Sequence, residues 1–159
     1  MSKIDEIKKE LDELKKGLLI VEPAHFSKRD LIDAFFGALF LGVTFAIKGL
    51  LIQVSLALDN LHLVLIVIST LLLLTAEIYF IGYNRVIKKS QRRFGQFWLK
   101  RIVSFYFVAV LTATFLVYLF GLNSLPDIAN NFQNVLRLIV LISLPCGIGA
   151  AITDLLKQY

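Results

Sequence analysis

The sequence predicts an all-α, polytopic membrane protein: a bundle of four transmembrane helices preceded by an amphipathic or coiled-coil helix. Two observations support this fold class. The chain of 159 residues is 57% hydrophobic and 18% charged, whereas a soluble domain is about 45–50% apolar and about 25% charged. The apolar residues also form four blocks, each longer than the ~20 residues that a helix needs to cross a bilayer. We expect these spans at about 31–58, 61–83, 102–122 and 132–156.

This composition excludes a soluble enzyme, a secreted disulfide scaffold and a disordered chain. The single cysteine, Cys146, lies inside the last apolar block, so no intrachain disulfide forms. His25 and His62 flank different blocks, which leaves no cysteine–histidine metal cluster. The sequence also has no glycine-rich phosphate loop and no Ser-His-Asp set. We therefore expect no enzyme activity, no catalytic residue, no metal and no cofactor.

Residues 1–22 are expected to form a separate cytoplasmic helix. Apolar residues recur at coiled-coil positions from Ile4 to Val21, and Glu10 and Lys15 occupy the flanking positions that pair coiled-coil strands. Three interpretations stay open: a self-associating helix, an amphipathic helix on the bilayer surface, or a helix packed on the protein's own loops. The membrane domain follows over 27–159.

The first span is expected to begin near Lys28. Ser27 is placed to cap this helix, with Asp30 as the reciprocal partner of a capping box.

Lysines and arginines outside the spans all fall on one side of a four-span topology. Seven precede the first span, seven lie between the second and third spans, and one follows the fourth. The connections 59–60 and 123–131 contain none. The positive-inside rule then predicts a multi-pass protein of the cell membrane with both termini and the basic loop 84–101 in the cytoplasm.

The basic loop contains seven cations and no acid. An orientation signal with aromatic anchors explains this composition without any further role. The same cations are suited to anionic lipid headgroups, at ~1 kcal/mol for each cation near the surface, whereas we expect no nucleic-acid partner. The candidate headgroup residues are Arg85, Lys88, Lys89, Arg92, Arg93, Lys100 and Arg101.

The first span, taken as one helix, has a polar face and a face of small residues. Asp33, Thr44 and Lys48 fall within an arc of roughly 60°. A second ridge, suited to close helix packing, consists of Ala34, Ala38, Gly42 and Ala46. We expect neither face to contact lipid.

Lys48 is the central prediction, because it lies ten residues before the end of its span. A charge at the bilayer centre costs about 2.5–3.5 kcal/mol, so such residues usually face a bundle interior or a cavity. Three interpretations stay open: a buried ion pair, for which Glu77 is the candidate acid, a residue lining a pore, or a lysine neutralised by burial. Glu77 could equally pair with Arg85 or Lys88 near its own end of the second span.

The fourth span combines polar residues with helix-breaking residues. Arg137 lies close enough to the outer end for its side chain to reach water. Pro145 is expected to kink the helix, and carbonyls freed by a kink can line an ion site; simple packing is the alternative. Ser143, Gly147 and Asp154 share a stripe on this helix. The third span carries no charge and is predicted to be the peripheral one.

The chain resembles an uncharacterised family of small prokaryotic, mainly archaeal, four-span integral membrane proteins. The run from Val21 to Phe26, followed by Asp33-Ala34-Phe35-Phe36-Gly37-Ala38, carries this resemblance. The family implies no activity and no site residue. A weaker similarity links 33–43 to the first span of prokaryotic lysosomal-type potassium channels, but Ala34–Gly37 stands where their Phe-Ser-Asp signature would be.

Two functions follow as hypotheses for what we expect to be a homo-oligomer in contact with lipid, including anionic lipid. The first is an ion channel or transporter whose path is lined by Asp33, Thr44, Lys48, Glu77, Arg137, Ser143, Pro145, Gly147 and Asp154. The second is a non-transporting scaffold or accessory subunit that acts through its N-terminal helix and basic loop. Ion flux through purified protein separates the two.

Overall fold

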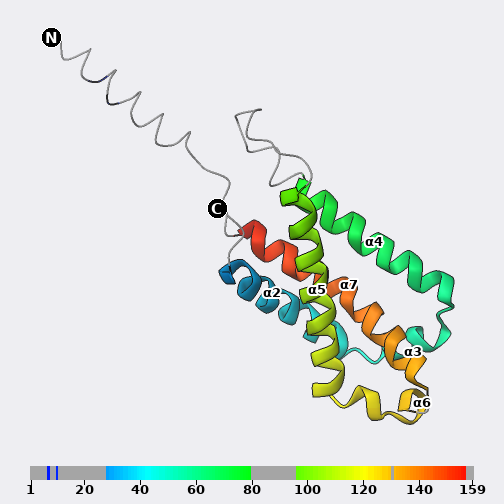
Figure 1. Ribbon diagram of the computed structural model, residues 1–159. Helices are drawn as coiled ribbons and strands as arrows, with labels where there is room; N and C mark the ends of the chain where they lie inside the picture. Colours follow the sequence, from blue (N-terminus) through cyan, green and yellow to red (C-terminus); the bar gives the residue numbers. More distant parts are fainter. Residues whose placement is uncertain (1–6, 8–9, 11–27, 80–95, 130, 157–159) are drawn as a thin grey trace.

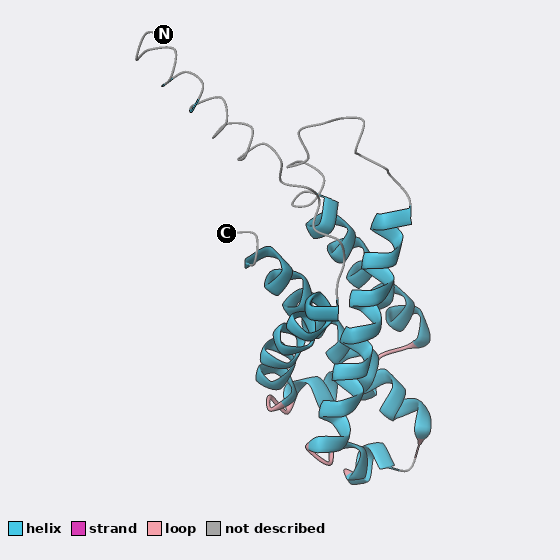
Figure 2. Cartoon of the chain, turned by 60° about the vertical axis from the view of Figure 1, so that its left-hand side comes forward, coloured by secondary structure: helices cyan, strands magenta, loops and turns pink. Residues whose placement is uncertain are grey.

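The structure is a computed structural model that describes residues 7, 10, 28–79, 96–129 and 131–156, with the backbone alone at 96–98 and 154–155. All regular structure in these ranges is helical (Figures 1 and 2). The elements in chain order are α2 (Lys28–Ala46), α3 (Leu50–Ala57), α4 (Asn60–Ile78), α5 (Gln96–Leu119), the 3-10 helix η3 (Leu122–Ser124), α6 (Pro126–Ala129) and α7 (Phe132–Leu156).

Three of these helices are long and apolar enough to cross a membrane: α4, α5 over Leu99–Leu119, and α7 over Phe132–Thr153. A fourth crossing is available if α2 and α3, which form a bent pair, count as one span. The prediction of an all-α membrane bundle is confirmed. The N-terminal helix, the cap at Ser27 and most of the basic loop lie outside the described residues.

The central element of the bundle is α7. It packs against α2, α3, α4 and α5, and most extensively against α2. The bundle therefore has two ends. The basic end is where α2 and α5 begin and where α4 and α7 finish; the loop end carries α3, η3 and α6 together with the starts of α4 and α7 (Figure 1).

Backbone contact joins α2 to α7. A Cβ atom added at Gly149 would meet the carbonyl oxygen of Gly37, and one added at Gly37 would meet the carbonyl oxygen of Gly149. One turn further along, a Cβ atom at Gly42 would lie 2.6 Å from Cys146 Sγ. The predicted small-residue ridge is confirmed as the packing face, since all four of its members are buried: Ala34, Ala38, Gly42 and Ala46.

The expected span over 31–58 is not one continuous helix. Helix α2 ends at Ala46, α3 begins at Leu50, and the two axes meet at 86°. A straight helix of that length would measure ~42 Å and exceed a hydrocarbon core ~30 Å thick, while α2 alone, with 19 residues, reaches about 28 Å. The chain turns at Gly49, the residue before α3, and Lys48 N–H donates to Phe45 O at 3.2 Å in the tightened last turn.

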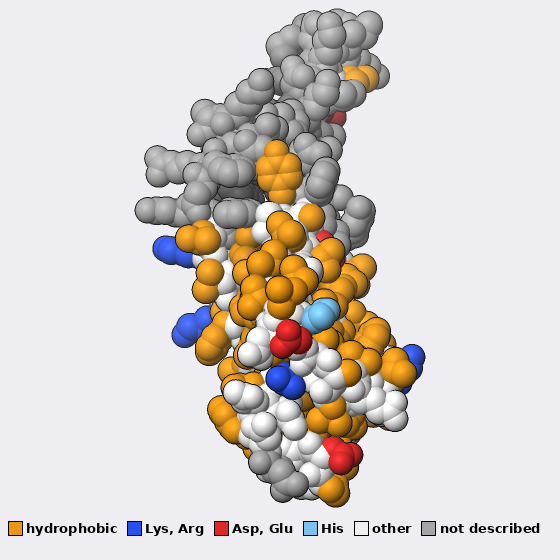
Figure 3. Space-filling view, turned by 90° about the vertical axis from the view of Figure 1, so that its right-hand side faces the viewer, with side chains coloured by type: hydrophobic (Ala, Val, Ile, Leu, Met, Phe, Trp, Pro, Cys, Tyr) orange, Lys and Arg blue, Asp and Glu red, His pale blue; other side chains and the backbone are white. Residues whose placement is uncertain are grey.

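The prediction that the third span is peripheral is also wrong. Only 17% of the apolar window of α4 is buried, against 44% for α5 and 56% for α7. Helix α5 packs on both α2 and α7, whereas α4 has α7 as its main neighbour. Figure 3 views the side on which α4 lies, and hydrophobic side chains cover most of the described part of that face. Helix α4 is thus the most lipid-exposed of the three long apolar helices.

Polar side chains close the helix ends at the loop end. Asp59 caps α4 by accepting a hydrogen bond from Asn60 N–H at 2.7 Å. Asn131 Oδ1 accepts from Gln133 N–H at 3.0 Å in the first turn of α7, and Asn134 Nδ2 donates to the carbonyl of Asp127 at 3.1 Å. The first two bonds satisfy backbone donors that the first turn of a helix otherwise leaves unpaired, and the third satisfies a carbonyl of α6.

The glycine contact leads to a stability prediction. We expect Gly149→Val to lower the free energy of unfolding by about 3 kcal/mol, because the new side chain meets backbone that cannot move aside. The matched control is Gly49→Ala, since nothing lies within 4 Å of a Cβ atom at Gly49. Thermal unfolding of both variants in the same detergent checks this; equal melting temperatures would contradict the packing.

Candidate functional site

The structure divides the residues predicted to form an ion path into separate groups. Ser143 and Gly147 lie on the face of α7 that meets α4 and α5, and the spacing of Glu77 places it on the same face of α4 as the buried Thr70 and Leu74. The α2 residues lie elsewhere. Because the meeting faces also contain Thr70 and Tyr106, we call the five residues Thr70, Glu77, Tyr106, Ser143 and Gly147 the α4–α7 seam.

The middle of the α4–α7 seam is tightly packed. A Cβ atom added at Gly147 would lie 3.1 Å from Thr70 Cγ2 and 3.8 Å from Ala109 Cβ, so the absence of a side chain at this position lets the three helices approach. Thr70 is buried, and its hydroxyl donates to Ile66 O of its own helix at 2.7 Å. This bond leaves the Thr70 oxygen lone pairs free to accept.

One turn of α7 closer to the loop end, Ser143 carries a second hydroxyl into the seam. Ser143 is buried and donates to Val140 O at 2.7 Å. The phenol of Tyr106 on α5 lies next to this hydroxyl. Polar groups of α5 and α7 therefore meet inside an apolar core.

Glu77 lies in the last turn of α4, at the basic end of the seam, and is spaced to share the face of Thr70 and Leu74. The side chain is half-buried, its Oε2 is inaccessible to solvent, and no hydrogen-bond partner of this atom lies in the described part of the chain. A carboxylate oxygen held in this way keeps its full capacity to bind a proton or a cation.

Lys48 does not lie in the middle of a span, so that prediction is wrong. The residue sits in the bend between α2 and α3, toward the loop end, and its side chain is exposed. Lys48 Nζ lies 5.8 Å from the centroid of the Phe45 ring, a cation–π arrangement. Glu77 is at the basic end, so the ion pair between the two is ruled out as well.

The remaining predicted path residues are scattered. Thr44 is exposed and its hydroxyl donates to Phe40 O at 3.0 Å. The polar face of the first span therefore lies on the surface of the single chain at Thr44 and Lys48, and the expectation that it does not contact lipid stays a prediction. Asp33 is half-buried near the start of α2. Arg137, near the start of α7, is half-buried, and its inaccessible Nε has no hydrogen-bond partner in the segments that the structure describes.

Pro145 and Asp154 are the two remaining residues of α7 that the sequence predicts to line the path. Helix α7 runs without a break from Phe132 to Leu156, and Pro145 is buried within it. Asp154 lies in the last turn, and its side chain is outside the described part of the chain. Of the seven predicted headgroup residues, only Lys100 and Arg101 are described; Lys100 is exposed and Arg101 half-buried, 5.9 Å from the Phe105 ring.

Sequence reasoning missed two residues of the seam for different reasons. Thr70 lies seven residues before Glu77, on the same face of the helix. The sequence contains this spacing, but the spacing is equally consistent with a role in helix packing alone. Tyr106 gave no signal, because its partner Ser143 is on another helix and only the tertiary structure brings them together.

The chemistry of the seam is that of hard oxygen ligands. It offers a carboxylate, two aliphatic hydroxyls and a phenol, and such groups suit protons and alkali cations better than soft metals. Among the described residues no group of three or more His, Cys, Asp or Glu side chains could hold a metal ion.

Comparison with known proteins gives one match. Residues 6–156 match the family model described as "Putative integral membrane protein (DUF2391)". No curated protein and no solved structure matches the chain. The expected resemblance to a family of uncharacterised integral membrane proteins is confirmed.

The surface position of Lys48 yields a prediction. We expect Lys48→Gln to change the free energy of unfolding by less than ~0.5 kcal/mol, as for other exposed positions. Thr70→Asp places a carboxylate in the packed seam and should be strongly destabilising. Unfolding of both variants in detergent is the measurement, and a large loss of stability in Lys48→Gln would contradict the exposed location.

Proposed function

The chain belongs to the DUF2391 family of integral membrane proteins, and from this premise we propose that it moves a small cation or a proton across the bilayer along the α4–α7 seam. The observation that carries the proposal is Glu77, whose inaccessible Oε2 has no hydrogen-bond partner among residues 28–79, 96–129 and 131–156. An ionisable group inside a membrane span is costly, and it is retained where it serves a pathway or a partner.

Two further features support this function. The hydroxyls of Thr70 and Ser143 and the phenol of Tyr106 continue the polar groups from Glu77 toward the middle of the bundle. Helix α4 is also the least buried of the long apolar helices, so a small displacement of α4 would widen the seam without breaking the α2–α7 contact. The proposed cycle binds the cation at Glu77 and passes it along the hydroxyls.

Orientation belongs to the same proposal. The positive-inside rule places the basic end, with its lysines and arginines, in the cytoplasm of a cell-membrane protein. Glu77 would then meet the cation from the cytoplasmic side. The loop end, with Asp59, Asp127 and the cations Lys48 and Arg137, would face the opposite compartment.

The test is flux through purified protein in liposomes under separate gradients of H⁺, Na⁺ and K⁺. We expect the wild type to move at least one of them. Glu77→Gln should lower that flux about ten-fold or more, because it removes the only ionisable carboxylate of the seam, and Tyr106→Phe should lower it less. The matched control is Asp127→Asn, an exposed carboxylate on α6, which should leave the flux unchanged.

Melting temperatures of the same proteins separate misfolding from loss of transport. A wild type that moves none of the three cations would remove the transport function. Flux that survives in Glu77→Gln would remove the seam as its path.

A second candidate, a non-transporting membrane scaffold, is favoured by the outer face of α4. The residues there are all exposed and alternate between small or polar and leucine at heptad spacing, the pattern of a left-handed helix pair: His62, Leu65, Ser69, Leu72 and Ala76. In a bilayer, leucine side chains contact lipid tails as favourably as they contact another helix. Close approach of the two backbones at the small residues would therefore have to stabilise the helix pair.

For this candidate we expect Ser69→Cys to form disulfide-linked dimers in oxidised membranes. The native Cys146 is buried and supplies a background that should not cross-link. The positional control is Phe40→Cys, an exposed residue of α2. Equal cross-linking of the two variants would show random collision, and no dimer with Ser69→Cys would reject α4 as an interface.

A further inference from the structure

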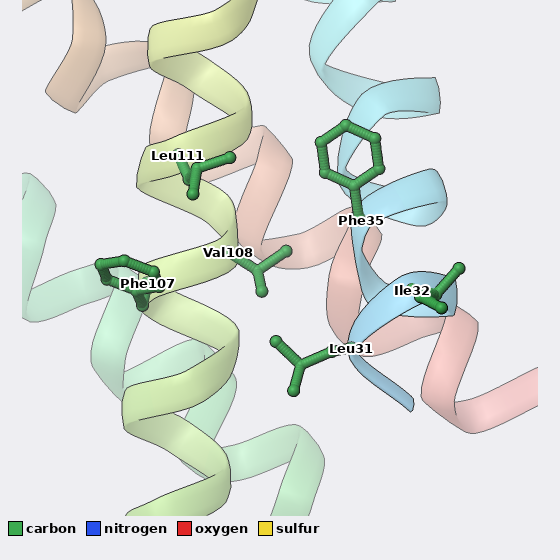
Figure 4. A pocket seen from close by; sticks show the side chains of 6 residues that line it. All are labelled: Leu31, Ile32, Phe35, Phe107, Val108 and Leu111. Carbon is green, nitrogen blue, oxygen red and sulfur yellow. The ribbon is translucent and has the colours of Figure 1, made fainter. Parts of the chain in front are cut away.

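An apolar groove lies between α2 and α5 at the basic end of the bundle. Its cavity measures about 260 Å³, and its lining presents carbon atoms only. Figure 4 shows the six lining side chains, three from each helix, with Leu31 and Val108 pointing toward one another across the gap. The lining residues are Leu31, Ile32, Phe35, Phe107, Val108 and Leu111.

The groove opens to the outside of the bundle and closes toward its middle. Its outer walls are exposed, with Ile32 at 55%, Phe107 at 65% and Leu111 at 49%, while Val108 on the floor is only 6% exposed. At the inner end the two helices meet, because the Phe35 and Phe115 rings lie 6.4 Å apart between centroids. A second helix, ~10 Å across, cannot enter a space of this size.

Positive charge flanks the same end of the same two helices. Lys28 and Arg29 lie one turn before Leu31 and Ile32, and exposed Lys100 lies two turns before Phe107 on the same face of α5. Both α2 and α5 also begin at this end, so two helix N-termini add their partial positive charge. Asp30 is the acid of this first turn, and it has an interaction of its own.

The depth of the groove below the cations matches the thickness of the hydrocarbon layer of one lipid leaflet. At a rise of 1.5 Å per residue, the lining residues of α2 lie about 5–11 Å below Lys28, and those of α5 lie about 11–17 Å below Lys100. Half of a hydrocarbon core is about 15 Å thick. An acyl chain in the groove would therefore place its phosphate at the level of the cations.

We propose that the α2–α5 groove is a binding site for an anionic glycerophospholipid, with one acyl chain between the two helices and the headgroup phosphate at Lys28, Arg29 and Lys100. The groove supplies contact for the chain, and the cations select the charge of the headgroup. This site is on the opposite side of α5 from the α4–α7 seam, so it stands independently of the proposed transport.

The experiment is native mass spectrometry of the full-length protein from micelles that contain equal amounts of phosphatidylglycerol and phosphatidylcholine. We expect the wild type to retain phosphatidylglycerol about ten-fold more often, since each cation near a surface favours an anionic headgroup. The triple variant Lys28→Gln, Arg29→Gln, Lys100→Gln should lose this preference. Leu111→Trp should fill the groove and lower retention of both lipids.

Two controls match the variants. Lys48→Gln removes an exposed cation at the loop end, and Leu72→Trp enlarges an exposed apolar residue of α4; both should behave like the wild type. Equal retention of the two lipids by the wild type would overturn the proposal, as would an unchanged preference in the triple variant or unchanged retention in Leu111→Trp.

A second measurement on the wild type needs no variant. Phosphatidylglycerol with a photoreactive group on its acyl chain should label 31–35 and 107–111, and excess unlabelled phosphatidylglycerol should suppress that labelling more than phosphatidylcholine does. Labelling that falls mainly on α4, or that both lipids suppress equally, would reject the site.

Discussion

The backbone contact between Gly37 of α2 and Gly149 of α7 is the interaction on which the rest of the bundle depends. Inside a bilayer, apolar side chains gain nothing by leaving lipid for protein, so close packing and hydrogen bonds must hold helices together. The main chains of α2 and α7 are in direct contact at this point because neither residue has a Cβ atom that would separate them. Because α7 is fixed to α2 in this way, it becomes the central helix on which α3, α4 and α5 pack.

The position of α4 follows from this contact. Helices α2 and α5 pack on each other and on α7, and α4 is left with one main neighbour and a large exposed face. Its inner face nevertheless carries polar groups, since Thr70 is buried and Glu77 has an inaccessible carboxylate oxygen. The least firmly packed of the long helices thus carries the carboxylate of the seam, an arrangement suited to movement around a polar path.

The bend at Gly49 has a different origin, the thickness of the bilayer. An apolar run of 28 residues is too long for one upright crossing, and the chain resolves the excess by turning α3 across the loop end. The turn brings Lys48 to the surface, where the ammonium group is no longer buried. A cation that the linear sequence places deep in a span is therefore exposed on the single chain and is not enclosed by its own helices.

The sequence by itself determined the class of fold, the three apolar helices from α4 onward and the packing ridge of α2, because segment length and the spacing of small residues are local properties. It could not determine which helix is central, since four apolar blocks of similar hydropathy differ only in the partners they find. Tertiary structure decided that α7 is central, that α4 is peripheral and that Tyr106 meets Ser143. The tertiary structure also decided where Lys48 lies, because the position of a helix break depends on how the ends of neighbouring helices pack as well as on the residues that form the break.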